Sequence, residues 1–142
     1  MHRVEIERVV DATPEEAFAR YTDHAGWTGW AGVGQVRLVR SGKPERDGVG
    51  AVRAFAPPLG LREEVTEFHP PTRMGYRIVA GGFPMKNHRG EVTFEPRGTG
   101  TRIAWSVVFD SRIPGLGRPT ALVARLLFST ILRRFARTTG GH

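Results

Sequence analysis

The sequence predicts an α+β fold, in which a curved antiparallel sheet of about six to seven strands wraps on one long C-terminal helix. Two observations predict it. Apolar and polar residues alternate over residues 88–94 and 101–109, on either side of a Gly-rich turn, which is typical of a hairpin with one face in water. After a Gly/Pro-rich break at 113–119, a helical pattern covers residues 118–137. A sheet that closes on a terminal helix leaves room for a cavity between the two.

The first element in chain order is a strand over residues 2–10, where apolar and acidic side chains alternate. A short helix to about residue 21 follows. Thr13 is a good N-cap for it, and Pro14 lacks an amide hydrogen where the first helical position needs none. Glu16 completes a capping box with Thr13. This is the best-supported local prediction in the chain.

A second short helix or turn and then a series of strands are predicted next. Trp27 and Trp30 are three residues apart and therefore share one helical face. Alternating runs separated by polar, Gly-rich or Pro-rich turns predict four further strands. These strands cover residues 35–40, 49–56, 61–68 and 73–80.

Length and composition fit one globular domain, so residues 1–142 are predicted as a single domain. The chain has no cysteine, which excludes disulfides, cysteine catalysis and thiolate–metal chemistry. No apolar run approaches the roughly 18 residues that span a bilayer, and the first residues do not resemble a signal segment. A cytoplasmic protein is expected, as a monomer or a homodimer.

The positive charge is concentrated in the C-terminal part of the chain. The formal net charge is +7, and residues 1–110 hold 15 Lys/Arg and all 14 Asp/Glu. Residues 111–142 hold six Arg and no acid. The basic character is therefore a property of the predicted terminal helix. Arg richness of this kind fits either a function of that helix or a coding bias.

Several short motifs together resemble one superfamily. They are Ala12-Thr13-Pro14-Glu15-Glu16-Ala17-Phe18, Trp27, Gly50-Ala51-Val52-Arg53, Glu64-Val65-Thr66-Glu67-Phe68 followed by Pro70-Pro71, Tyr76-Arg77-Ile78 and Gly100-Thr101-Arg102-Ile103-Ala104-Trp105. Their order over nearly the whole chain resembles the START/polyketide cyclase-like (SRPBCC) superfamily. The resemblance implies the helix-grip fold and a deep, mostly apolar pocket between sheet and terminal helix. Its members include cyclases, lipid and sterol carriers, and hormone receptors, so it does not name a ligand.

The residues expected to face this pocket form the main candidate site. From the strands they are Met74, Tyr76, His88, Val92, Phe94, Ile103, Trp105 and Val107, and from the helix Phe128, Ile131 and Phe135. Three of them, Tyr76, His88 and Trp105, can hydrogen-bond a ligand. The competing interpretation is that all these side chains only fill the core, and that His88 is a satisfied or exposed histidine.

Arg53 and Glu64 form a second candidate pair. If residues 57–60 are a four-residue loop, Arg53 lies opposite Glu64 across a hairpin. The pair is then either a surface ion pair or a polar group at the pocket wall. The strand over residues 61–68 does not alternate cleanly, so Glu63 can face inward instead of Glu64.

The chain lacks the usual motifs of catalytic and metal sites. It has no nucleophile elbow, no phosphate-binding Gly loop and no His pair at metal-ligand spacing, so neither a metal nor a cofactor is expected. The first hypothesis is therefore binding or transport of a hydrophobic small molecule, lipid-like or polycyclic. The alternative is a polyketide cyclase or dehydratase that uses the same pocket with positioned acids and bases.

The terminal helix suggests a third hypothesis, docking to a membrane or a protein. Leu122 and Leu126 fall among the arginines of the face opposite the apolar one. Basic and apolar residues mixed on one face suit an anionic membrane or a protein partner. The competing interpretation is that both leucines pack under the loop around Trp27 and Trp30. No nucleic acid is expected, because no aromatic residues are interleaved with basic ones on an open sheet.

Overall fold

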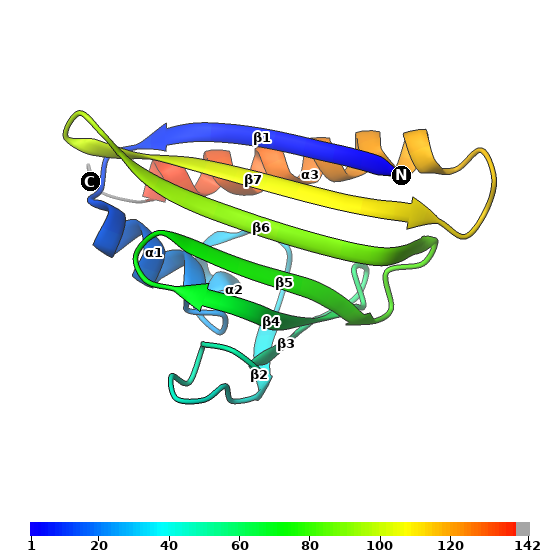
Figure 1. The fold of residues 1–142 in the computed structure, drawn as a ribbon, viewed down its shortest axis with the longest axis horizontal. Helices are drawn as coiled ribbons and strands as arrows, with labels where there is room; N and C mark the ends of the chain where they lie inside the picture. The colour runs from blue at the N-terminus through cyan, green and yellow to red at the C-terminus, as the bar shows by residue number, and fades with distance from the viewer. Residues whose placement is uncertain (139–142) are drawn as a thin grey trace.

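The computed structural model describes residues 1–138 and confirms the α+β fold (Figure 1). Residues 139–142 of the predicted domain lie outside the described residues. The elements are β1 (His2–Val10), α1 (Pro14–Thr22), α2 (Trp27–Trp30), β2 (Val36–Arg40), β3 (Val52–Phe55), β4 (Arg62–His69), β5 (Arg73–Ala80), β6 (Met85–Arg97), β7 (Gly100–Ser111) and α3 (Gly117–Thr138). The strands form one antiparallel sheet in the order β1-β7-β6-β5-β4-β3-β2.

One face of this sheet carries all three helices. Helix α3 runs along β1 and β7, and α1 and α2 cover the end of the same face where α3 finishes (Figure 1). The core lies between these helices and the sheet, and it includes Phe18, Trp30 and Phe135. In the described residues, no helix is long and apolar enough to cross a membrane.

The cap of α1 forms as the sequence predicts. The Glu16 amide donates to Thr13 Oγ1 at 3.2 Å, which satisfies one of the free N–H groups of the first turn. The Glu16 carboxylate meets the Thr13 hydroxyl at 3.1 Å instead of reaching the Thr13 amide. Trp27 and Trp30 share a face as expected, and both are buried with ring centroids 5.0 Å apart.

The predicted pairing of Arg53 with Glu64 is wrong by one residue. In the hairpin of β3 and β4, Arg53 lies opposite Glu63, and Val52 lies opposite Glu64. The Phe55 amide donates to the Leu61 carbonyl at 2.9 Å, so the loop holds five residues, 56–60, and not four. Gly60 takes a positive φ of 57° at its end, which suits glycine. Because side chains alternate along a strand, this shift places Glu63 inside and Glu64 outside.

The outer face of α3 also decides between two interpretations. Leu122 and Leu126 are 58% and 61% exposed, so the interpretation that they pack under the Trp27–Trp30 segment is wrong. Arg134 occupies that position instead, and its Nε donates to the Trp30 carbonyl at 2.8 Å. The long Arg side chain can cover apolar surface while its head bonds a backbone group.

Candidate functional site

A cavity of about 240 Å³ lies between α3 and the strands from β3 to β7. Two loops, residues 56–60 and 81–84, border it. Its apolar wall consists of Trp27, Phe55, Pro58, Leu59, Leu61, Ile78, Phe83, Met85, Trp105, Val123, Ala124, Leu127, Phe128 and Ile131. Of the ionisable side chains in residues 1–138, three reach it: Arg53, Glu63 and His88. An apolar pocket with a few convergent polar groups is the usual form of a small-molecule site.

Arg53 is buried at the base of the cavity with only 2% of its surface exposed. Its Nε and Nη2 donate to Glu63 Oε1 at 2.8 and 2.5 Å. The guanidinium also lies over the rings of Trp27 and Phe55, 4.4 and 5.1 Å from their centroids. Burial has the largest single effect and lowers the pKa of Arg53, but Glu63, Tyr21 and Tyr76 together raise it more, so the net shift is upward. The pair is therefore a buried ion pair whose two charges cancel.

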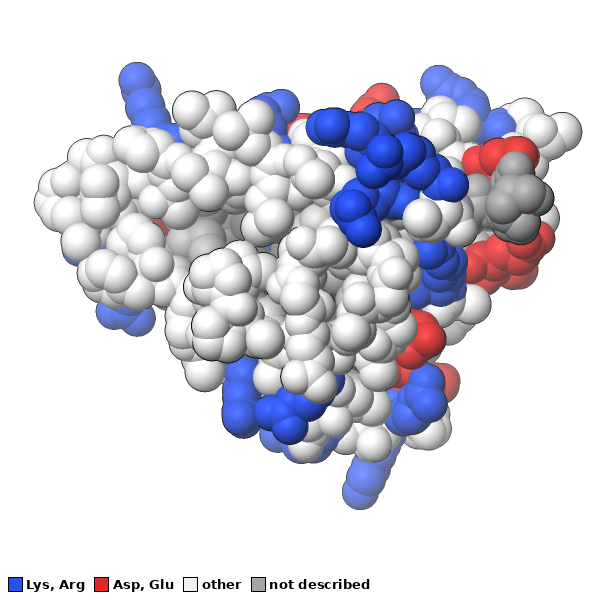
Figure 2. Space-filling model, turned by 180° about the vertical axis from the view of Figure 1, so that it is seen from behind, with Lys and Arg blue, Asp and Glu red and all other residues white. Residues whose placement is uncertain are grey.

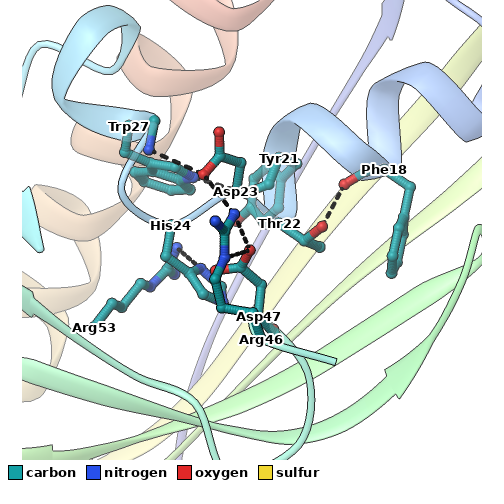
Figure 3. A network of polar contacts seen from close by, with 10 residues as sticks. Phe18, Tyr21, Thr22, Asp23, His24, Trp27, Arg46, Asp47 and Arg53 are labelled. Atoms are coloured by element: carbon teal, nitrogen blue, oxygen red, sulfur yellow. Dashed lines mark hydrogen bonds and ion pairs between the residues drawn. The ribbon is translucent and has the colours of Figure 1, made fainter. Parts of the chain in front are cut away.

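His24 contacts Arg53 at Nη1, a nitrogen that Glu63 does not contact (Figure 3). Its Nδ1 lies 3.4 Å from Arg53 Nη1, and its Nε2 lies 3.2 Å from the Asp47 carbonyl. An arginine only donates and a carbonyl only accepts, so Nδ1 accepts and Nε2 carries the hydrogen. Burial, and next the Arg53 cation, lower the pKa of His24 to about 3. His24 is thus a neutral support that holds Arg53 in place.

Tyr76 and Trp105 form a second buried hydrogen bond close to the pair. Trp105 Nε1 donates to the Tyr76 hydroxyl at 2.7 Å, and the Trp105 ring stacks on Phe128 with centroids 4.2 Å apart. Burial, together with the Glu63 carboxylate, raises the pKa of Tyr76 well above its ordinary value. The neighbouring Gly90 leaves room for this ring, because a Cβ there would lie 2.2 Å from Tyr76 Cζ.

His88 closes a gap between two strands. β5 and β6 pair only from Arg73 to Tyr76, and beyond this point the two strands diverge (Figure 1). The Ile78 amide lies beyond the paired stretch and donates to the His88 side chain instead, at Nδ1 and 3.1 Å. Burial lowers the pKa of His88 more than the Glu63 carboxylate raises it, so the ring is neutral near pH 7.

Comparison with known proteins identifies the family of this chain. The sequence matches, over residues 1–139, the family described as polyketide cyclase/dehydrase and lipid transport. The chain belongs to this family. No curated protein sequence matches it.

Solved structures with the same fold are similar in shape and distant in sequence. XoxI from Bacillus cereus has a TM-score of 0.78 at 17% identity, covering 96% of this chain and 94% of its own. A protein from Thermobifida fusca has a TM-score of 0.75 at 20% identity, covering 100% and 98%. Ara h 8.0201 has a TM-score of 0.70 at 16% identity, covering 96% and 99%. These likenesses confirm the helix-grip fold.

Within this member of the polyketide cyclase/dehydrase and lipid transport family, the predicted site residues fall into three groups. Those at the cavity are Arg53, His88, Trp105, Phe128 and Ile131. Those in the core and away from the cavity wall are Met74, Tyr76, Val92, Phe94, Ile103, Val107 and Phe135. Glu64 is on the other face of the sheet, where it pairs with Arg40 at 2.5 Å and Arg77 at 2.8 Å. The described residues hold no cluster of three or more metal-ligating acids or histidines.

Sequence reasoning missed much of this family member's cavity wall. Glu63 was the open alternative to Glu64, and the strand pattern could not choose between them. Phe83 and Leu59 come from loops, where no periodicity indicates which way a side chain points. His24 lies in a turn and gives no signal in the sequence beyond the presence of a histidine.

Proposed function

We propose that this chain binds a small hydrophobic molecule in the cavity between α3 and the sheet, as a carrier or sequestering protein. The observation that carries the proposal is the apolar wall with Arg53, Glu63 and His88 gathered at one part of it. A volume of about 240 Å³ is near the lower end of ligand pockets, which run from about 300 to 1,000 Å³. The size favours a compact ligand of one or two rings over a long acyl chain.

Two side chains that the alternative function, acid–base catalysis, was expected to use are already engaged. Tyr76 accepts a hydrogen bond from Trp105, and its raised pKa keeps the phenol from losing its proton near pH 7. The lone pair of His88 Nδ1 is taken by the Ile78 amide. A general base needs a free lone pair within reach of the substrate, so Tyr76 and the Nδ1 atom of His88 do not serve as one, and Glu63 is left as the candidate base for the alternative function.

The test fills the cavity. Ala124 lies on the α3 wall, so Ala124→Phe places a ring in the space that a ligand would occupy. The matched control is Leu122→Phe, a ring of the same size on the exposed face of the same helix. A neutral dye that fluoresces in apolar surroundings is titrated into each protein, and circular dichroism confirms that each is folded. We expect Ala124→Phe to lose binding and Leu122→Phe to keep it. Equal binding by a folded Ala124→Phe protein would contradict the proposal.

We also propose a second function, contact with an anionic membrane surface. Phe83 and Val123 line the cavity and are 70% and 65% exposed, so the mouth of the cavity is itself apolar. Leu122 and Leu126 extend this surface along α3, with Arg125 and Arg133 on the same side. Uncharged residues cover most of this side of the molecule, with Lys and Arg around them (Figure 2). A hydrophobic ligand could then leave a bilayer without crossing water.

Vesicle co-sedimentation tests the membrane contact. Wild type is expected to sediment with anionic vesicles at low salt, and less at high salt, because the Coulomb attraction is screened while the apolar contact is not. Changing Arg125, Arg133 and Arg137 to Gln removes the salt-dependent part. Changing Leu122 and Leu126 to Ser should remove the part of the binding that persists at high salt. The membrane function fails if wild type ignores anionic vesicles at low salt.

A further inference from the structure

Two polar atoms at the cavity have hydrogen-bonding capacity that the described residues do not use. Glu63 receives Arg53 through Oε1 alone, and its Oε2 makes no hydrogen bond or ion pair within residues 1–138. His88 is engaged through Nδ1 alone. Both side chains line the cavity. Neither atom is among the fully buried, unpartnered polar atoms of the described residues, so both are accessible from the cavity and free to bond a ligand there.

The roles of these two atoms are opposite and fixed. The Ile78 amide can only donate, so His88 Nδ1 accepts and, in the neutral ring, Nε2 carries the hydrogen. The Glu63 carboxylate can only accept. The two side chains are neighbours at the cavity, because Ile78 is both the strand partner of Glu63 and the donor to His88, and the Glu63 carboxylate acts on the pKa of His88. No hydrogen bond joins Glu63 directly to His88 in the part of the chain that is described.

The charge of Arg53 does not make this an anion site. Its guanidinium already faces Glu63, His24 and the rings of Trp27 and Phe55, and the Glu63 charge cancels its own. An anionic ligand group at Oε2 would meet a carboxylate in surroundings of low dielectric, which is strongly unfavourable. A carbonyl could accept from His88 but would leave Glu63 without a partner. An ammonium group could pair with Glu63 but could not accept from His88.

One simple neutral group satisfies both atoms, a hydroxyl. We propose that the cavity selects small hydrophobic alcohols or phenols, whose hydroxyl donates to Glu63 Oε2 and accepts from His88 Nε2–H. The inference rests on the proposed function, and it adds the chemical class of the ligand. The rings of Trp105 and Phe128 at the same cavity suit a flat aromatic body for that ligand.

The experiment compares four probes with one ring system by isothermal titration calorimetry: 2-naphthol, 2-methylnaphthalene, 2-acetonaphthone and 2-naphthoate. We expect 2-naphthol to bind about tenfold or more tightly than 2-methylnaphthalene, since each hydrogen bond adds a modest gain in affinity. We expect 2-naphthoate to bind most weakly. Equal affinities for naphthol and methylnaphthalene would overturn the hydroxyl assignment and leave the apolar cavity standing. Tightest binding of acetonaphthone or naphthoate would overturn it as well. If no probe binds, the proposed function fails too.

Variants separate the two atoms of the site. His88→Leu removes the donor and should reduce the preference for naphthol over methylnaphthalene to that of a single hydrogen bond. His88→Gln can accept from Ile78 and donate to the ligand, so it should retain the preference. Glu63→Gln removes the charge that cancels Arg53 and should raise the affinity for 2-naphthoate about tenfold or more. If His88→Leu is folded and keeps the full preference, the site is elsewhere.

Discussion

The space between the sheet and α3 is filled at one end and open at the other. At the filled end, α1 and α2 insert aromatic rings under α3. Tyr21 meets Phe94 at 5.7 Å between ring centroids, and Trp30 meets Phe135 at 5.0 Å, both edge to face. At the open end α3 presents the small Ala124 to the cavity, and of the two short helices only α2 reaches it within residues 1–138, through Trp27. The cavity thus occurs where the sheet extends beyond the short helices.

The two ends also differ in what closes them. The filled end is covered by the helices α1 and α2. The open end is covered by two loops, residues 56–60 and 81–84, and its outer rim is apolar. The free energy of unfolding should therefore depend mainly on the filled end, because its side chains are buried. Ligand binding should depend mainly on the open end, because a ligand needs accessible space.

The largest expected change in stability comes from a substitution at the filled end. Phe135→Ala should lower the free energy of unfolding by about 5 kcal/mol, the upper part of the range for such changes, because the ring is fully buried among other rings. Leu126→Ala, on the exposed side of the same helix, should lower it by less than about 0.5 kcal/mol. Urea unfolding measures both. Similar losses for the two variants would mean that α3 packs differently.

A smaller effect is expected where the two ends meet, at the buried ion pair. Glu63→Ala should lower the free energy of unfolding by about 3 kcal/mol, because it leaves the Arg53 charge buried without a partner. Glu64→Ala, one residue further on the outer face, should lower it by about 0–1 kcal/mol, as for exposed ion pairs. Urea unfolding of both proteins is the measurement. The reverse order of losses would restore the register in which Arg53 faces Glu64.

The smallest effect is the dependence of stability on pH that comes from His24. The unfolded histidine takes up a proton near pH 6.5, whereas the folded one does so only near pH 3. Between these values the unfolded state binds more protons, so acid favours unfolding, by up to about 1.4 kcal/mol per pH unit from this residue. His24→Gln should flatten the slope between pH 6 and 4, and His69→Gln, at an exposed position, should not. The two slopes are compared by urea unfolding at each pH. An unchanged slope in His24→Gln would show that His24 is not the group that titrates.

The fold and the site differ in how far the sequence predicts them. The strands, the Thr13 cap and the inward face of α3 follow from periodicity and capping rules, because local patterns specify them. The partner of Arg53 does not, because it depends on a loop with one more residue than the four-residue turn suggests. A single step in register changes which glutamate is buried, and no strand pattern shows that step.

The residues of the cavity wall could not all be predicted from sequence patterns, for a related reason. Trp105 and Ile131 follow from strand and helix faces, whereas Phe83 lies on a loop whose position depends on tertiary contacts. Whether an inward side chain meets a neighbour or empty space depends on the distance between elements. Trp105 and Val107 alternate on the same face of β7, yet Trp105 reaches the cavity and Val107 does not.

The hydrogen bond from the Ile78 amide to His88 gives this cavity a spectroscopic reporter. The imidazole joins a backbone N–H on one nitrogen to the cavity on the other. Because hydrogen bonds in a chain polarise one another, a group that accepts from Nε2 changes the strength of the bond at Nδ1. The amide proton resonance of Ile78 should therefore shift when the hydroxyl is engaged, and shift less when only the ring of an apolar probe occupies the cavity.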